Sequence, residues 1–269
     1  MTEKPITDYD EEVKNCSCSY CGNNCDDITY LLKDKKIVGV RHACRLGASK
    51  IINDEDQRLL NPMIRNESGI LEETTWNQAL DKTAELLHNS LRPVLYGWGE
   101  TSIEAIKQGI KIAETTGSVI DNQSTICHGA TIQAFQNVGH PVMTLGEVKN
   151  RADVIIYVGT NPMDDHPRHL SRYTTFPEGF FRPNGRKDRK LITIDPKYTN
   201  TAKVSDEWIQ YDMDEDYTFF NALRMVLKGN TLTSKEIAGV PVDKIYELAE
   251  TMKNAEYGMH GAVGLQHRI

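Results

Sequence analysis

The sequence predicts an α/β protein in which a small cysteine-bearing domain precedes Rossmann-like domains with parallel sheets. Three observations lead to this fold class. Five of the six cysteines lie between positions 16 and 44, which sets the first part of the chain apart. From about residue 63 onward, short apolar runs alternate with longer amphipathic segments, as in parallel α/β folds. The 269 residues are enough for one large or two ordinary domains.

Composition and charge exclude several classes of protein. Hydrophobic residues make up 39% and charged residues 26%, an ordinary soluble balance. The net charge of −7 argues against a nucleic-acid surface, which needs clustered basic side chains. No apolar run is long enough for a membrane span. Residues 1–15 are polar and acidic, unlike a secretory signal. We therefore expect a cytoplasmic protein, in which clustered cysteines indicate a metal site rather than disulfides.

The cysteine-bearing domain is expected to cover residues 1–62. Within it, residues 28–40 predict a hairpin, because apolar runs flank a polar turn at residues 33–36.

A first α/β domain is expected over residues 63–123. Thr75 can cap a helix, with Gln78 three residues later to complete a capping box. Residues 93–99 predict a buried strand that ends in glycines. The amphipathic helix after it should stop at Gly117.

A second α/β domain is expected over residues 124–255. Its predicted strands are 152–162 and 190–197, and its predicted helices cover about 214–228 and 241–253. Residues 256–269 are expected to start a return to the first α/β domain. Because the sequence stops after this strand-like segment with no helix to cover it, we expect a fragment of a longer chain.

Four of the five clustered cysteines have the spacing of a metal site. Cys18-x2-Cys21-x3-Cys25 is followed after eighteen residues by Cys44. Four thiolates suit a cubane [4Fe-4S] cluster, with one thiolate for each iron. A structural zinc also takes four cysteines, but usually as two separated pairs. The pattern favours the cluster, with zinc or inert thiols as alternatives, and Cys16 is interpreted as a spare thiol.

The sixth cysteine stands alone, in the segment QSTICHG at residues 123–129. A lone cysteine between α/β elements is usually a small buried apolar residue. A thiolate at Cys127 would also be a suitable ligand for a metal that prefers soft donors. His128 changes charge near neutral pH and could handle a proton, although a hydrogen-bonded core histidine is the ordinary alternative.

Glycine-bearing and polar segments follow the predicted strands. In open α/β sheets, ligands bind beyond the carboxyl ends of the strands, where glycine allows close backbone approach. Residues 159–162, with His166 shortly after, and the segment beginning at Asp195 are such candidates, although both also fit ordinary turns. Residues 96–99 could line the same ligand, or Trp98 could fill the core.

The two cysteine-bearing segments of the N-terminal domain resemble a known family. CSYCGNNCDDI at residues 18–28 and RHACRLG at residues 41–47 resemble the N-terminal cluster domain of molybdopterin oxidoreductases of the dimethyl sulfoxide reductase superfamily. They resemble more narrowly the B subunits of formylmethanofuran dehydrogenases. The resemblance extends from about residue 15 to the end.

The resemblance implies a role for each candidate residue. Cys18, Cys21, Cys25 and Cys44 would hold a [4Fe-4S] cluster. Cys127 would ligate tungsten or molybdenum, and His128 would contact substrate. The residues implied to bind the cofactors are Gly97, Gly159, Asn161, Pro162, His166, Asp195, Lys197 and Thr201. Asp206 continues the family sequence pattern that begins at Asp195. Lys50 is a candidate bridge between the cluster and the pterin. Lys50 could equally be a solvated helix-face lysine. Lys197 stands where the family has arginine, which puts bidentate phosphate pairing there in doubt.

The function implied is that of the catalytic subunit of a formylmethanofuran dehydrogenase. Such a subunit reversibly reduces CO2 to formate at a tungsten or molybdenum bis-pterin centre (molybdopterin guanine dinucleotide), for formylmethanofuran synthesis in methanogenesis. Implied partners are a ferredoxin or polyferredoxin and a hydrolase-like subunit that joins formate to methanofuran. A formate dehydrogenase-type oxidoreductase and a non-catalytic iron–sulfur electron-transfer subunit are the alternatives. The family's C-terminal domain and substrate-contacting arginine have no counterpart in this sequence.

Overall fold

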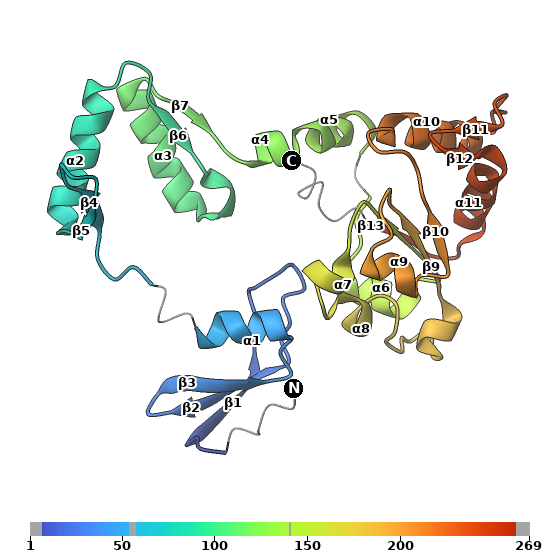
Figure 1. Ribbon diagram of the computed structural model, residues 1–269, viewed down its shortest axis with the longest axis horizontal. Helices are drawn as coiled ribbons and strands as arrows, with labels where there is room; N and C mark the ends of the chain where they lie inside the picture. Colours follow the sequence, from blue (N-terminus) through green and yellow to red (C-terminus); the bar gives the residue numbers. More distant parts are fainter. Residues whose placement is uncertain (1–6, 54–57, 140, 262–269) are drawn as a thin grey trace. The chain divides into compact units, whose positions relative to one another are not determined.

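A computed structural model describes residues 7–53, 58–139 and 141–261 (Figure 1). Its contacts divide the chain into two units. The first combines the described parts of Met1–Asn53 and Val142–Ile269, and the second is the described part of Asp54–Pro141. Both units contain helices and parallel strands, which confirms the predicted mixed α/β class.

The N-terminal part of the first unit is a three-stranded antiparallel sheet followed by a helix. Its elements are β1 (Glu11–Cys16), β2 (Ile28–Lys33), β3 (Lys36–Arg41) and α1 (Arg45–Ile52). The predicted hairpin is confirmed as β2–β3. Asp34 and Lys35 both have positive φ, as a two-residue hairpin turn requires. Strand β1 was not predicted, because Val13 is its only strongly apolar residue apart from Cys16, and it forms by pairing with β2.

The larger part of the first unit is a four-stranded parallel sheet in the order β10-β9-β8-β13 (Figure 1). Its strands are β8 (Val154–Val158), β9 (Lys190–Ile194), β10 (Glu207–Ile209) and β13 (Gly258–Gly261). Strand β8 is buried on both faces. Val154 and Ile156 pack with the apolar sides of two long helices, whereas Ile155 and Tyr157 face a second cluster on the other side. This alternation is that of a sheet covered on both faces.

Helices and short elements cover this sheet. They are α6 (Leu145–Arg151), α7 (Pro162–Asp165), α8 (His169–Arg172), η3 (Gly185–Asp188), α9 (Asn200–Val204), α10 (Asp216–Leu227), β11 (Glu236–Ile237), β12 (Val240–Pro241) and α11 (Val242–Asn254). The two long helices predicted from the sequence are confirmed as α10 and α11. Phe219 and Leu223 of α10 and Ile245 of α11 are buried against β8 and β9.

The last strand differs from expectation. Residues 256–269 were expected to return to the first α/β domain, but β13 pairs in parallel with β8, with Met259 opposite Ile155. The preceding helix α11 packs on this same sheet, and a parallel crossover brings the chain back to the sheet its helix covers. Residues 262–269 lie outside the described residues, and the other expected domain boundaries stay predictions.

The second unit contains a two-stranded parallel sheet with helices. Its elements are β4 (Met63–Arg65), β5 (Leu71–Glu73), α2 (Trp76–Asn89), β6 (Val94–Tyr96), η2 (Trp98–Glu100), α3 (Ile103–Thr116), β7 (Val119–Asp121), α4 (Ser124–Cys127) and α5 (Gly129–Val138). The capping box of Thr75 and Gln78 is confirmed, as is the stop at Gly117, which is left-handed. Strands β6 and β7 are parallel, so their carboxyl ends meet at one edge.

None of the helices in the described ranges is both long and apolar enough to cross a membrane.

Candidate functional site

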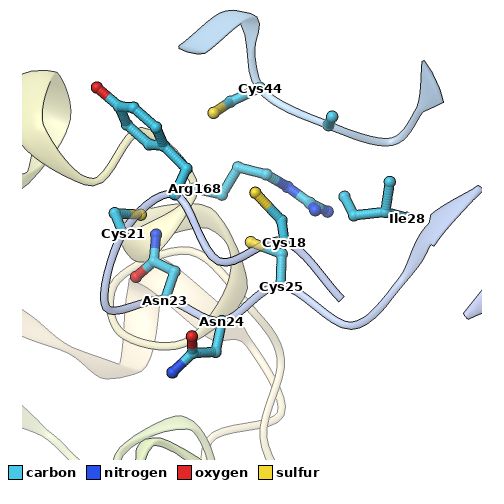
Figure 2. Close-up of a pocket in the computed structure, with 10 residues that line it drawn as sticks. Cys18, Cys21, Asn23, Asn24, Cys25, Ile28, Cys44 and Arg168 are labelled. Atoms are coloured by element: carbon cyan, nitrogen blue, oxygen red, sulfur yellow. The ribbon is translucent and has the colours of Figure 1, made fainter. Parts of the chain in front are cut away.

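Four of the cysteines line one small pocket in the first unit. Figure 2 shows the sulfur atoms of Cys18, Cys21, Cys25 and Cys44 around a common space. The loop that carries the first three is closed by a hydrogen bond from the Cys18 amide to the Cys25 carbonyl, 2.8 Å long. Cys44 comes from the other side of the hairpin as the N-cap of α1. The predicted quartet is therefore brought together.

A glycine makes room for these sulfurs. The Gly47 amide donates a 3.3 Å hydrogen bond to Sγ of Cys44. A Cβ atom at Gly47 would lie 3.0 Å from Sγ of Cys18 and 3.6 Å from Sγ of Cys44. Sequence reasoning missed this residue, although a glycine three positions after the fourth cysteine is a readable signal.

The four thiols interact electrostatically. Burial raises the pKa of Cys21, and the nearby sulfurs of Cys25, Cys44 and Cys18 raise it further. Four thiolates this close repel one another unless a cationic centre compensates them. Such a soft donor set suits iron or zinc.

Cys16 does not line this pocket. Its thiol donates to the carbonyl of Val13 at 3.2 Å, within strand β1. This position agrees with its interpretation as a spare thiol.

The cysteine loop is fastened to the segment that follows β8. The Asn23 side chain accepts a 2.8 Å hydrogen bond from Nδ1 of His169 and donates to the carbonyl of His166 at 3.3 Å. The Tyr173 hydroxyl donates to the Asn23 carbonyl at 3.1 Å. Burial, and to a smaller extent the charge of His166, lower the pKa of His169 to about 4. His169 is thus a neutral donor at physiological pH.

Charged side chains complete this contact. Arg168 donates to both carboxylate oxygens of Asp27, at 2.7 and 2.6 Å. Arg172 donates to Asp27 at 2.9 Å and to Asp26 at 2.7 Å. The hydrogen bond from Arg168 holds the pKa of Asp27 below its usual value. Sequence reasoning assigned no role to any of these four residues.

A second cavity lies at the carboxyl ends of β8 and β9. It has a volume of about 230 Å³ and is lined by Gly159, Thr160, Asn161, Asp165, Asp195, Pro196, Lys197, Thr199 and Met213. Gly159 has a left-handed φ of 57°, which turns the chain away from β8. The hydroxyl of Thr160 is buried and has no hydrogen-bond partner among the described residues. An orphaned buried hydroxyl beside a polar cavity marks a place for a polar ligand.

Other predicted residues hold the residues that line this cavity in place. Thr201 is fully buried, and both its amide and its hydroxyl donate to the side-chain oxygen of Asn161, at 3.1 and 2.8 Å. Thr201 therefore positions Asn161. The Asp195 carboxylate accepts from the Lys197 amide at 2.8 Å, which shapes the turn after β9. Pro162 is buried at the first position of α7.

Two predicted residues lie away from the cavity. Nε2 of His166 would be 3.7 Å from a Cβ atom at Gly22, so this ring borders the cysteine loop. Asp206 accepts from the Leu191 amide at 2.7 Å, near the amino end of β9, and pairs with Arg186 at 2.7 Å. The position of Asp206 is explained by these contacts, whereas the buried Nδ1 of His166 has no hydrogen-bond partner among the described residues.

In the second unit, Cys127 and His128 follow the carboxyl end of β7. Cys127 is the half-buried last residue of α4, and His128 is exposed beside it. Sγ of Cys127 lies 4.0 Å from Nε2 of His128. The Gly99 amide donates to the side chain of Gln123 at 3.0 Å, which ties the loop after β6 to the loop after β7.

The loop after β6 turns at Gly97, whose φ of 106° favours glycine. Trp98 packs on α3, where a Cβ atom at Gly109 would lie 2.4 Å from its ring. Its buried Nε1 has no hydrogen-bond partner among the described residues, so lining a ligand and filling the core both stay open as interpretations of Trp98. Lys50, in the first unit, is exposed in the last turn of α1.

Comparisons with known proteins converge on one family. The family model "Molybdopterin oxidoreductase" matches residues 58–253. The chain is 47% identical, over 91% of its length, to the B subunit of the tungsten-containing formylmethanofuran dehydrogenase 2 of Methanocaldococcus jannaschii, and covers 57% of it. It is 42% identical, over 96% of its length, to the protein of the same name from Methanococcus maripaludis, and covers 62% of it. The chain therefore spans about three fifths of the length of these relatives.

More distant matches are also found, and the superposed structures among them share the fold. The F420-dependent formate dehydrogenase subunit alpha of M. jannaschii is 28% identical over 90% of the chain, which covers 37% of that protein. Acetylene hydratase from Pelobacter acetylenicus superposes with a TM-score of 0.61 at 16% identity, over 92% of this chain and 40% of that one. The formyltransferase/hydrolase complex from Methylorubrum extorquens gives 0.51 at 24% identity, over 68% of this chain and 48% of that one.

Proposed function

Because the chain belongs to the molybdopterin oxidoreductase family, we propose that it acts in the catalytic B subunit of a formylmethanofuran dehydrogenase. The main support for this proposal is the sequence identity of 42–47%, over more than nine tenths of the chain, to two proteins of that name. The proposed reaction is reversible reduction of CO2 to formate. The formate dehydrogenase-type alternative has weaker support, since its representative is 28% identical.

The N-terminal pocket is proposed to hold a [4Fe-4S] cluster on Cys18, Cys21, Cys25 and Cys44, with residues 1–62 as the cluster domain. A single zinc draws four thiolates to about 2.3 Å from one centre. A cubane offers each thiolate its own iron and holds the sulfurs farther apart. Four cysteines that line one pocket, with the CxxCxxxC spacing of the first three, support the cluster, and the space left at Gly47 agrees with this.

The cavity beyond β8 and β9 is proposed to bind part of a molybdopterin guanine dinucleotide. The orphaned Thr160 hydroxyl fits a polar ligand, and Asn161, held by Thr201, can present its amide. The Asp195 carboxylate can accept from a guanine edge or a ribose hydroxyl. Lys197 can serve a phosphate as a point charge but not as a bidentate fork.

The residues that would hold the tungsten or molybdenum centre are in the second unit. When bound, the metal–pterin group supplies the redox chemistry at carbon. Cys127 is proposed as its protein ligand, and the exposed His128 as the group that moves a proton or orients CO2. Gly97 is proposed to let the backbone approach the cofactor, and Lys50 to bridge cluster and pterin. A ferredoxin-type donor and a hydrolase-like subunit are the proposed partners.

Metal content tests the proposal. The purified whole protein, prepared without oxygen, should contain about four irons at the N-terminal site and tungsten or molybdenum in addition. Cys21→Ser should lose the iron–sulfur absorbance, whereas the matched variant Cys16→Ser should keep it. Iron without tungsten or molybdenum would support a non-catalytic relay, and zinc in place of iron would overturn the cluster assignment. Formate oxidation without formylmethanofuran turnover would favour the formate dehydrogenase alternative.

A further inference from the structure

One short segment after β8 lines both of the proposed cofactor sites. Near its start, Asn161 and Asp165 line the cavity beyond β8 and β9. A few residues later, Arg168 lines the cysteine pocket (Figure 2). Residues 161–172, which we call the connecting segment, therefore join the two sites directly.

The connecting segment cannot hold its own shape. Its helices α7 and α8 have four residues each, and isolated helices this short do not persist in water. At the cavity end, the Asn161 side chain accepts hydrogen bonds from the amide and the hydroxyl of Thr201. The Met163 amide donates to the same hydroxyl at 3.2 Å. The order of the connecting segment thus depends on tertiary contacts such as these.

At the other end, Asn23 joins the connecting segment to the loop that carries the first three cysteines. Asn23 is 2% exposed. Its side chain accepts from Nδ1 of His169 at 2.8 Å and donates to the carbonyl of His166 at 3.3 Å. Its carbonyl accepts from the Tyr173 hydroxyl at 3.1 Å. One buried side chain of the cysteine loop is therefore bonded to both halves of the connecting segment.

His169 depends on this contact. It is 7% exposed, and its buried Nε2 has no hydrogen-bond partner among the described residues. The bond from Nδ1 to Asn23 is thus the one hydrogen bond of this ring in the described part of the chain. Burying a polar ring costs free energy unless it is hydrogen-bonded. Docking of the cysteine loop therefore stabilises the buried position of His169, and with it α8.

We infer that Asn23 and His169 are positioning residues that couple the two cofactor sites, so that a ligand in the cavity beyond β8 and β9 strengthens binding of the cluster. The inference rests on the proposed function, since it requires both sites to bind their groups. A ligand that orders one end of the connecting segment leaves less disorder for the second group to remove at the other end. Such coupling is reciprocal, because each ligand raises the affinity of the other by the same factor.

The test uses the full chain, purified with its cluster from cells that make no pterin, and guanosine diphosphate (GDP) as a probe for the nucleotide end of the proposed cofactor. Calorimetry should show that GDP binds the cluster-loaded protein at least about fivefold more tightly than the cluster-free protein, the lower end of ordinary coupling between sites. At equilibrium with a chelator, GDP should raise the fraction of chains that keep their iron. GDP should also slow hydrogen exchange across the connecting segment.

Variants of the pair separate coupling from general stability. His169→Phe keeps a ring but removes the Nδ1 donor, so the ratio of the two GDP affinities should fall to about one. His169→Asn places an amide donor at the same number of bonds from Cα as Nδ1, and should restore part of the ratio. Tyr157→Phe is the matched control, because it removes the buried 2.8 Å hydrogen bond to Thr174 but no contact with the cysteine loop. Its ratio should stay at the wild-type value. Asn23→Leu, of similar shape, tests the pair from the other side if His169→Phe fails to fold.

The outcomes distinguish the inference from the proposed function. Equal GDP affinity with and without the cluster, unchanged exchange across the connecting segment, or a wild-type ratio in a folded His169→Phe or Asn23→Leu variant would overturn the inference and leave the proposed function intact. A wild-type protein that holds no iron, or that binds no GDP, would overturn the assigned cofactor sites and the inference with them.

Discussion

Replacing Gly47 with alanine tests whether the cysteine pocket is built around a bulky metal group. Gly47 lies in the first turn of α1, where its new Cβ atom would be 3.0 Å from Sγ of Cys18 and 3.6 Å from Sγ of Cys44. Ordinary contacts between such atoms begin at about 3.5–4.0 Å, so the Cys18 sulfur must move by several tenths of an ångström.

The magnitude depends on whether the sulfurs are fixed. In the metal-free chain, the Cys18 side chain can rotate away, and alanine gains up to about 1 kcal/mol of helix propensity over glycine. With a cluster bound, the sulfur is held by iron, and overpacking of this kind costs about 1–3 kcal/mol. Cluster retention should therefore weaken by roughly 5- to 150-fold.

Two measurements on the same variant check this reasoning. Thermal melting of metal-free Gly47→Ala should be equal to or above that of wild type, whereas iron bound per chain after dialysis against a chelator should fall. Gly146→Ala is the matched control, since its Cβ atom would meet only Thr144 at an ordinary 3.8 Å in helix α6. Full iron retention in Gly47→Ala would refute the view that this glycine makes room for a cluster.

Three further predictions concern other parts of the site. Thr160→Val removes a buried hydroxyl without a described partner, so the cofactor-free protein should gain about 1 kcal/mol in urea unfolding while the purified protein retains less pterin; unchanged pterin content would contradict the cavity assignment. Cys127→Ala should abolish CO2 reduction with a low-potential dye but leave the N-terminal iron, because the cysteines belong to separate loops; near-normal activity with full tungsten or molybdenum content would rule out the ligand role. Acidification should loosen α8, because burial, followed by the charge of His166, lowers the pKa of His169 from 6.5 to about 4. The unfolded segment then binds more protons between these values, so stability is lost as pH falls through this window. Hydrogen exchange of residues 166–174, corrected for intrinsic rates, should be faster at pH 5 than at pH 7 in wild type but much less pH-dependent in His169→Gln.

Elements whose determinants are local were predictable. The capping box at Thr75, the glycine stop at Gly117 and the β2–β3 turn are each specified by neighbouring residues, and all three are confirmed. Strand β1 was not predictable in this way, because its run of charged residues carries no strand pattern and its extended form depends on the edge of β2.

The same distinction between local and long-range determinants applies to the site residues. Cysteine spacing was enough to predict that Cys18, Cys21 and Cys25 share a pocket with Cys44. The pairing of Asp27 with Arg168 was not, since charged surface residues have no spacing code that reaches 141 positions along the chain. Motif resemblance also cannot separate a residue that faces a ligand from one that supports it, which is why the buried Thr201 was grouped with the cofactor contacts.

Because the cysteine loop and α8 are far apart in the sequence, the ribosome makes the cysteine loop well before it makes α8. Asp27 and Arg168 are 141 residues apart, so at about 5–20 residues per second a ribosome makes the first roughly 7–30 s before the second. During that interval the cysteine hairpin exists without the arginines that neutralise its aspartates. A metal group delivered before Arg168 is made would meet a cysteine loop whose aspartates have no arginine partners. A metal group delivered later would meet a loop whose aspartates are already paired with the arginines. For the proposed cluster, the time of metal delivery relative to translation would therefore decide which of these two sites the metal meets.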